Sequence, residues 1–222
     1  MVNIKIDSNI TVPNFKMGVI LYHNIAIDDS PQMLKGRLQF FQETLRMELE
    51  TKELTNYEGI AEWRQIFKLL KMNPGRYRPS HEALLRRIKK GDNLPLVHSA
   101  VDLNTFFSLE YCIPLGIYDL DHIQGDVILR LGKEEDSYEG VNGRVNDMNE
   151  KLISSDNLGA FGSPIVDSTR TKVTTNTTSA LQLFYLRPSM TQAEATQLLE
   201  AAGKMFTQIH GGDFEQSVVE RT

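Results

Sequence analysis

Apolar residues near the amino terminus recur at every second position, and further along the chain the spacing changes to three and four. Phe15, Met17, Val19 and Leu21 alternate with their neighbours, which predicts a β-strand with one apolar face. The longer spacing is typical of helices that bury one side. It predicts four helices, over about residues 33–54, 57–71, 80–90 and 102–111.

Helix-breaking and capping residues separate these segments. Asn73, Pro74 and Gly75 end the second helix, because proline and glycine disfavour its continuation. Ser80 is placed to cap the start of the third helix, and Gly91 suits a left-handed cap at its end. The first half of the chain is therefore predicted to be mainly helical.

The second half is predicted to form strands and one final helix. Thr191 and Glu194 make a capping box at the start of an amphipathic helix over 190–211, and the tail from Asp213 is expected to fray. Together the patterns predict one α+β domain over 1–222, with mixed β-sheets and packed helices. The expected strands lie at 115–119 and 127–131, near residues 152, 165 and 173, and at 181–186.

Composition is ordinary for a globular protein, with 41% hydrophobic and 24% charged residues. The single cysteine, Cys112, excludes an internal disulfide and a cysteine-rich zinc site. No apolar stretch is long enough to cross a bilayer, and the first residues lack the pattern of a signal peptide. We therefore expect a cytoplasmic protein with no membrane partner, and the oligomeric state stays open.

Positive charge is concentrated in one segment of an otherwise acidic chain. The net charge is −5, which argues against a surface wholly devoted to nucleic acid, and no DNA partner is expected. Residues 64–90, however, carry nine basic side chains and one acidic one, Glu82. This segment therefore has a charge of +8 and the rest of the chain −13. Such a cluster can direct a polyanion to one face, although charge runs are often only solvated helix faces.

Motifs for the common cofactors and catalytic sites are absent from the sequence. There is no phosphate-binding loop, no zinc-protease motif and no nucleophile elbow, and the five histidines are scattered. We therefore predict no cofactor and no metal. Cys112 could be a nucleophile or a small core residue, and Asp119 with Asp121 could hold magnesium or cap a turn.

Hydroxyl side chains crowd the segment from Asp167 to Ser179. Threonine favours strands because its branched side chain packs on a pleated surface. On the inner face of a cleft these hydroxyls could hold a polar ligand or a water. The alternative is a strand and turn that face solvent.

Several short motifs occur in the order found in one known family. They are the runs Arg76–Ser80, Val101–Asn104, Ile113–Asp121 and Gly125–Arg130. In these motifs the chain resembles stand-alone relatives of the editing module in the beta subunit of bacterial phenylalanyl-tRNA synthetase, over about residues 57–186. In the synthetase this module, its third and fourth structural segments, hydrolyses tyrosine mischarged onto the phenylalanine tRNA. The resemblance implies a similar α+β fold and an aminoacyl-tRNA deacylase.

Editing corrects errors that a hydrophobic pocket cannot avoid when two amino acids have nearly the same shape. The resemblance implies that a positioned water attacks the ester, so no catalytic triad is needed. Asn104, Thr105 and Thr169 are then the expected catalytic residues, with backbone amides near Gly162 and Ser163 steadying the oxyanion. The other expected substrate-binding residues are Asp102, Gly116, Ser168 and Thr174.

The chain departs from the synthetase pattern at three places. The polar pair Asn104-Thr105 stands in reversed order, and Gly116 takes the position of a histidine that helps to grip the substrate. The strand expected to carry a glutamate that reads the tyrosine hydroxyl contains Gln182 and no acid. A smaller or more polar amino acid, or none at all, therefore fits as well as tyrosine does.

The resemblance also implies that the protein meets tRNA in trans, because the modules that load amino acid and ATP are missing. The basic segment is predicted to hold the acceptor-stem backbone, and Tyr77 could stack on terminal bases or be a half-buried turn residue. The predicted tRNA contacts are Arg76, Tyr77, Arg78, Arg86, Arg87 and Lys90.

Three hypotheses remain open at this point. The first is a free-standing aminoacyl-tRNA deacylase, the second a non-catalytic module that binds tRNA or an amino-acid-like ligand, and the third a small-molecule hydrolase that reuses the pocket. The first needs a cleft between the helix at Asp102 and the hydroxyl-rich segment beyond Asp167, with positive charge at its mouth.

Overall fold

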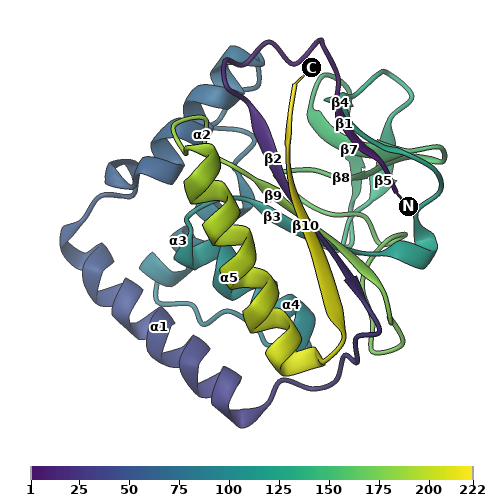
Figure 1. Cartoon of the computed structure of the whole chain (residues 1–222). Coiled ribbons are helices and arrows are strands. Elements are labelled where there is room, and N and C mark those ends of the chain that lie inside the picture. The colour runs from purple at the N-terminus through teal and green to yellow at the C-terminus, as the bar shows by residue number, and fades with distance from the viewer. Residues whose placement is uncertain (1, 222) are drawn as a thin grey trace.

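The computed structural model describes residues 2–221 and contains helices and three β-sheets (Figure 1). The helices are α1 (Gln32–Thr51), α2 (Glu58–Leu69), α3 (Ser80–Lys89), α4 (Ser99–Glu110) and α5 (Gln192–His210), with short 3-10 turns η1 (Leu54–Asn56) and η2 (Leu120–His122). Within residues 2–221, no helix combines the length and the apolar content that crossing a lipid bilayer requires.

The strands lie mostly in the second half of the chain. They are β1 (Ile4–Ile6), β2 (Lys16–His23), β3 (Leu115–Asp119), β4 (Val127–Leu131), β5 (Ser137–Glu139), β6 (Val145–Asp147), β7 (Leu152–Asp156), β8 (Gly159–Gly162), β9 (Ala180–Tyr185) and β10 (Asp213–Glu220). The predicted α+β class is confirmed, because antiparallel and parallel pairings occur beside packed helices.

The central sheet has the strand order β10-β2-β9-β3, and all its neighbours are antiparallel. Helix α5 lies across one face (Figure 1), where Phe206 stacks on Tyr22 of β2. The other face packs on the sheet β1-β4-β7-β8, where Tyr118 meets Phe161 edge to face. The prediction that β2 has one apolar face was therefore wrong in part. Both of its faces are buried, and Ile20 and Tyr22 have no exposed surface.

The strand register determines which side chains of β3 can meet the helices. Ile117 stands opposite Gln182 of β9, and Gln182 faces α4. Gly116 and Tyr118 alternate with Ile117 and therefore point to the second sheet. The central sheet thus separates two groups of residues that lie close together in the sequence.

The tail that was expected to fray is an edge strand of the central sheet. β10 pairs with the whole length of β2. Gly211 and Gly212 both have positive φ, at 69° and 73°, and this glycine pair reverses the chain after α5. Phe214 then packs against Gly203 of α5, which helps to hold the strand down. The prediction failed because this strand is half polar and gains its order from pairing with a distant strand.

Other local predictions also need correction. The N-cap of α3 is Pro79 and not Ser80. The Ser80 backbone N–H donates to the Pro164 carbonyl oxygen at 2.7 Å. Helix α4 begins at Ser99, earlier than expected, because the His98 ring caps it. Residues 159–162 form strand β8, and no strand forms near Ile165, where one was expected. The residues around Val173 make only an isolated bridge between Lys172 and Tyr118.

Candidate functional site

Asn104, the first expected catalytic residue, belongs to a buried polar chain on the helix side of the central sheet. Its Oδ1 accepts a hydrogen bond from Gln182 Nε2 at 2.8 Å. Gln182 Oε1 in turn accepts from the Tyr22 hydroxyl at 2.8 Å. Gln182 has no exposed surface, so both of its polar groups depend on these partners. The side-chain oxygen of Asn104 is thus already held by the core.

Asp102 is also held by structural contacts. Its carboxylate accepts from the Ser30 hydroxyl at 2.6 Å and from the Val97 backbone N–H at 2.8 Å, and only 2% of the residue is exposed. These bonds attach the loop before α1 to the start of α4. Thr105 lies on the same helix, half-buried. The expected role of Asp102 in binding substrate is therefore not supported by its surroundings.

Gly116 and Gly162 lie on the opposite side of the central sheet from Asn104, and the ring of Tyr118 fills the space beside them. A Cβ atom added to Gly116 would lie 1.9 Å from the Tyr118 hydroxyl oxygen, and one added to Gly162 would lie 2.3 Å from the same atom. Both positions therefore need glycine to admit the tyrosine. The pocket expected to combine Asn104 with Gly116 and Gly162 does not form, because the sheet divides these residues.

The Tyr118 hydroxyl donates to Asp167 Oδ1 at 2.6 Å, and this pair was missed in the sequence analysis. Asp167 is half-buried, and burial raises the pKa of its carboxyl to about 7. Burial also raises the pKa of Tyr118 well above its ordinary value, and the nearby Asp167 adds to this. A carboxyl that changes charge near neutral pH is a candidate acid or base. Only the crowding of glycines and hydroxyls around it in the sequence could have pointed to this place.

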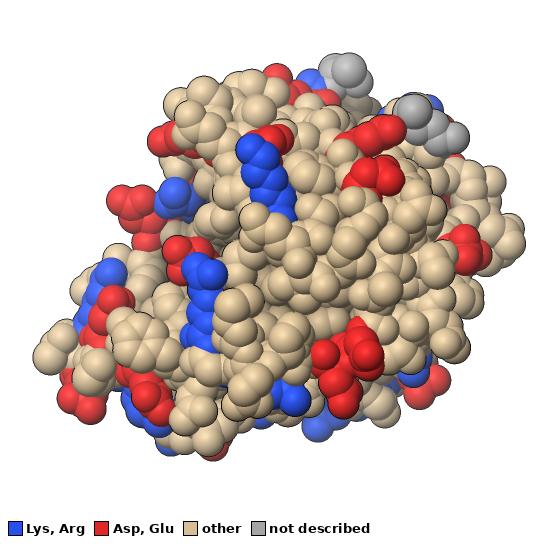
Figure 2. All heavy atoms as spheres, turned by 60° about the horizontal axis from the view of Figure 1, so that its bottom comes forward, with Lys and Arg blue, Asp and Glu red and all other residues tan. Residues whose placement is uncertain are grey.

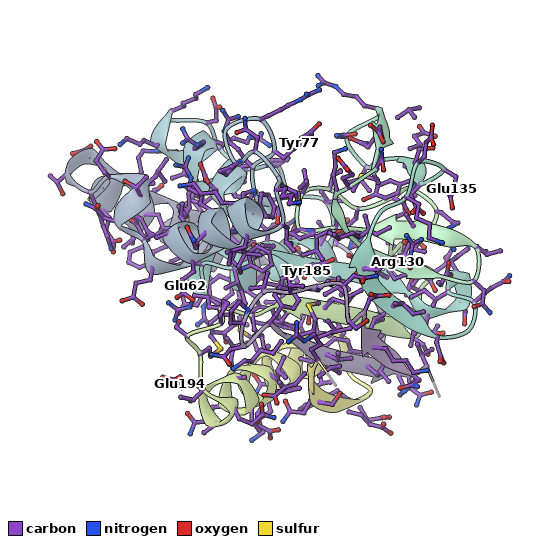
Figure 3. The ribbon with its side chains drawn as sticks, turned by 90° about the horizontal axis from the view of Figure 1, so that it is seen from above. Glu62, Tyr77, Arg130, Glu135, Tyr185 and Glu194 are labelled. Carbon is purple, nitrogen blue, oxygen red and sulfur yellow. The ribbon has the colours of Figure 1, made fainter. Side chains whose placement is uncertain are left out.

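A second tyrosine extends this polar cluster into the core. Tyr185 lies near the centre of the molecule (Figure 3), and its hydroxyl is 3.1 Å from Ser154 Oγ of β7. Burial is the main cause that raises the pKa of Tyr185, and the charge of Asp167 acts in the same direction. We call Tyr118, Asp167, Tyr185 and Ser154 the inter-sheet cluster.

The hydroxyl-rich segment uses most of its side chains to hold its own turns. Ser163 Oγ donates to the Val166 carbonyl at 2.9 Å, and Thr169 Oγ1 donates to the Glu139 carbonyl at 3.2 Å. Ser168 Oγ is buried, 3.3 Å from the Thr171 hydroxyl, and Thr174 Oγ1 accepts from a backbone N–H two residues later. These contacts match the turn alternative more closely than a row of ligand-binding hydroxyls.

The two elements of the expected cleft nevertheless lie side by side. The His98 ring, which caps α4, is 3.2 Å from the Val173 carbonyl oxygen. The contact joins the start of α4 to the middle of the hydroxyl-rich segment. The start of α4 and the hydroxyl-rich segment are therefore adjacent, as expected. The expected catalytic side chains Asn104 and Thr169 do not meet, because each is hydrogen-bonded to a different partner.

Four side chains of the basic segment gather in one place. Arg78, Arg86, Arg87 and Lys90 line one surface hollow of about 300 Å³ on α3, together with Ala83 and Asp92. Arg78, Arg87 and Lys90 are exposed, and none of the three makes an ion pair within residues 2–221. The face in Figure 2, in contrast, shows acidic and basic side chains scattered between wide uncharged areas. Unpaired cations around one hollow are suited to an anionic ligand.

A buried carboxylate fixes the inner side of this basic helix. Glu82 is fully buried and accepts two hydrogen bonds from Arg64, at 2.9 and 2.7 Å, and one from Arg86 at 2.8 Å. Burial raises the pKa of Glu82, but the hydrogen bonds from Arg64 and Arg86 outweigh it, so the pKa lies below its usual range. The charge of Arg86 is therefore partly neutralised, and its hydrogen bond to Glu82 fixes this arginine at the side of the hollow.

The basic helix is also attached to the loop that carries Asp167. The Ser80 backbone N–H at the start of α3 donates to the Pro164 carbonyl oxygen at 2.7 Å. Asp167 follows three positions after Pro164 along the chain. The start of α3 is thus attached to the loop that leads to the inter-sheet cluster.

The surroundings of Tyr77 match the alternative of a half-buried residue. The Lys151 ammonium lies 4.8 Å from the centre of its ring, and the Arg76 guanidinium lies 5.2 Å from it. The ring is half-buried against the core, toward one edge of the molecule in Figure 3. Both cations therefore already lie close to this ring.

The remaining two candidates have structural roles. Burial raises the pKa of the Cys112 thiol to about 11, which disfavours the reactive thiolate. Asp119 caps η2 by accepting from the Asp121 backbone N–H at 3.0 Å. Across the described part of the chain, no group of three or more histidine, cysteine, aspartate or glutamate side chains has the arrangement of a metal site.

Comparison with known proteins gives the family. The profile of the B3/4 domain matches residues 62–206. The chain belongs to the B3/4 domain family. This agrees with the resemblance to the editing module that the sequence motifs indicated.

Individual relatives of this B3/4 protein fall into two groups. The "uncharacterized protein YhzB" of Bacillus subtilis (strain 168) is 34% identical over 215 residues, which cover 95% of this chain and 96% of that protein. The phenylalanine–tRNA ligase beta subunit of Paramagnetospirillum magneticum is 23% identical over 176 residues, which cover 63% of this chain but 22% of the ligase subunit. The B3/4 chain therefore matches one small protein over nearly its full length and one part of a much larger one.

One solved structure can also be aligned with the chain. An N-terminal fragment of the phenylalanyl-tRNA synthetase beta subunit from Pyrococcus horikoshii aligns with the whole B3/4 chain at a TM-score of 0.49 and 11% identity. The alignment covers 52% of that fragment. The B3/4 chain thus spans about half of the fragment's length.

Proposed function

We propose that this B3/4 protein binds tRNA through the basic hollow on α3 and does not use the predicted catalytic residues to hydrolyse an ester. The observation that carries the proposal is the convergence of Arg78, Arg87 and Lys90 around one hollow, all of them exposed and without ion pairs within residues 2–221. This is the second of the three hypotheses that the sequence left open.

A nucleic-acid backbone suits such a hollow because each phosphate carries one negative charge and displaces bound counter-ions when a cation meets it. The negative remainder of the chain would repel the same ligand elsewhere and so favour one orientation. The match to a tRNA ligase subunit supports tRNA as the polyanion. Contacts of this kind position the RNA without reading its sequence.

The surroundings of the predicted catalytic residues argue against hydrolysis by that set. Asn104 is bonded to Gln182 on one face of the central sheet, and the ring of Tyr118 occupies the gap beside Gly116 on the other. Positioned catalysis needs its groups within hydrogen-bond reach of one reacting atom. These residues cannot reach a common atom while the sheet lies between them.

The test is the affinity for tRNA of paired charge-reversal variants. We expect the double variant Arg78→Glu/Arg87→Glu to bind labelled tRNA roughly 10-fold to 100-fold more weakly, because two phosphate contacts become repulsive. The matched control is Lys5→Glu/Lys204→Glu, which changes the net charge equally at two exposed lysines outside the hollow. Equal losses in both variants would show that binding depends on net charge alone, and tight binding by both would reject the hollow.

A second function, ester hydrolysis at Asp167, is favoured by one specific observation. Its half-buried carboxyl, whose pKa is raised by burial to about 7, touches Tyr118 beside the two glycines. As a carboxylate it could take a proton from water while that water attacks an ester carbonyl, and the carboxyl could then give this proton to the departing alkoxide oxygen as the ester bond breaks. The Tyr118 ring must leave the glycine gap to admit a substrate.

Asp167→Asn distinguishes this second function from the first. Loss of ester hydrolysis in Asp167→Asn, with unchanged tRNA affinity, would support hydrolysis at Asp167. If the wild-type protein releases no amino acid from any misacylated tRNA offered, the second function is rejected and the binding function is untouched.

A further inference from the structure

Helix α1 carries an apolar line on its outward side in addition to the stripe that it buries. Met33, Phe40 and Met47 follow one another at intervals of seven residues and are 75%, 72% and 65% exposed. Seven residues are close to two helical turns, so the three side chains stand in one row about 21 Å long. The inward stripe of α1 consists of Leu34, Leu38, Gln42, Leu45 and Leu49.

No element of the described chain covers this row. α1 runs along the outer edge of the molecule in Figure 1, and its contacts with α3 and α4 come from its other side. Other large exposed apolar residues, such as Val145 and Leu158, form no comparable row, and Leu69 stands alone at the end of α2. Three large apolar side chains aligned on one helix are typical of a surface that packs against another helix.

Charges beside this row change sign along the helix. Arg37 flanks the row in its first half, with its guanidinium 5.0 Å from the centre of the Phe106 ring, whereas Glu43, Glu48 and Glu50 flank the row in its second half. The other two cations near the carboxyl end are engaged elsewhere. Arg46 donates to Asn93 Oδ1 at 3.0 Å, and the Lys52 ammonium lies 3.9 Å from the centre of the Tyr57 ring.

We propose that a second copy of this chain packs on α1 in antiparallel orientation. Centring the pair on Phe40 places the two Phe40 rings together and sets Met33 opposite the partner's Met47. Arg37 of each helix then lies beside the acidic second half of the other. A parallel arrangement would instead place charges of the same sign side by side.

Two local features suit this pairing. Gly36 lies next to the row with open space around its Cα, so the partner helix can approach closely there. Arg37 is exposed and lies on the same side of the row as Glu48, so it can reach the partner's Glu48. Glu48 uses one carboxylate oxygen to accept from Tyr57, and its other oxygen has no partner within residues 2–221.

The test is the mass of the full chain in solution, measured by sedimentation velocity over a range of concentrations. We expect a reversible dimer, with Phe40→Asp raising its dissociation constant by roughly 30-fold or more, because the central contact becomes a buried charge. Val145→Asp, a control at a residue that is 79% exposed on β6, should leave the mass unchanged. Circular dichroism verifies that both variants are folded.

A charge exchange tests the orientation. Arg37→Glu should weaken the dimer, and Arg37→Glu/Glu48→Arg should restore it, since the antiparallel pair brings these positions together. A wild-type chain that stays monomeric at the highest concentration overturns the proposal, as does a Phe40→Asp variant that dimerises as tightly as the wild type. Failure of the double variant to recover overturns the antiparallel pairing.

Discussion

The two faces of the central sheet carry polar clusters that differ in one respect. On the helix face, Asn104, Gln182 and Tyr22 form a chain in which each link is a hydrogen bond between neutral groups. On the other face, Tyr118 is bonded to Asp167, a half-buried carboxyl. The first cluster has no group that changes charge near neutral pH, whereas the pKa of Asp167, raised by burial, is about 7.

The difference is between a cluster held together by neutral hydrogen bonds and a cluster whose charge can change. A buried neutral chain fixes how α4 and the sheet fit together, because any mismatch leaves a donor or acceptor unpaired. A carboxyl whose pKa lies near the ambient pH is present in both its protonated and its charged form, so it can exchange a proton with a ligand or with water. The predicted catalytic residue Asn104 belongs to the first kind.

Breaking the neutral chain should have the largest effect. Gln182→Ala removes the hydrogen-bond partner of the Tyr22 hydroxyl and that of Asn104 Oδ1. It also opens a cavity in a fully buried site. We expect the free energy of unfolding to fall by about 3 kcal/mol. Urea denaturation measures it. A loss below about 1 kcal/mol would show that the chain is not structural.

Removing the charge of Asp167 should have a smaller effect that depends on pH. Because the folded-state pKa lies above the unfolded-state value, the folded protein binds more protons between about pH 4 and pH 7, and its stability falls as the pH rises through this range. Asp167→Asn removes this loss, so we expect the variant to be more stable than the wild type by about 2 kcal/mol at pH 8.

Urea denaturation at pH 5 and pH 8 checks the prediction for Asp167→Asn. The difference between variant and wild type should be larger at pH 8. Asn104→Ala is the matched variant on the other face, and its effect should be the same at both values. A wild-type and an Asp167→Asn protein with parallel pH profiles would contradict the assigned pKa.

The smallest effect is expected from removing the Tyr118 hydroxyl. Tyr118→Phe deletes the hydrogen bond that favours the charged form of Asp167, so the pKa of this carboxyl should rise further above about 7. The free energy of unfolding should fall by about 1 kcal/mol. NMR titration of the Asp167 carboxyl measures the pKa. An unchanged or lowered pKa would mean that the hydroxyl does not stabilise the carboxylate.

Local signals in the sequence predicted much of the fold. The capping box at Thr191 and Glu194 starts α5 as expected, and the limits of β3 and β4 agree with the apolar runs. Strand β10 was missed, because its order comes from pairing with β2 far away in the sequence. Elements with their own caps and periodicity are visible locally, whereas edge strands depend on their neighbours.

The candidate site was less predictable for the same reason. Asn104 and Gln182 are 78 positions apart, and Tyr118 and Asp167 are 49 apart, so neither pair is visible as a motif. The cations of α3 are close in sequence and fall on one helix, and they do line one hollow. Sequence patterns therefore indicated where positive charge gathers, but they did not indicate the polar pairs, because the sheet register decides which of those side chains meet.

The most direct test of the account is the lifetime of the ester bond in misacylated tRNA at saturating protein. If the protein binds tRNA on α3 without hydrolysis, the lifetime should equal or exceed that of the free misacylated tRNA for every amino acid offered. A shortened lifetime with the wild type, restored by Asp167→Asn, would contradict this account and assign hydrolysis to the inter-sheet cluster.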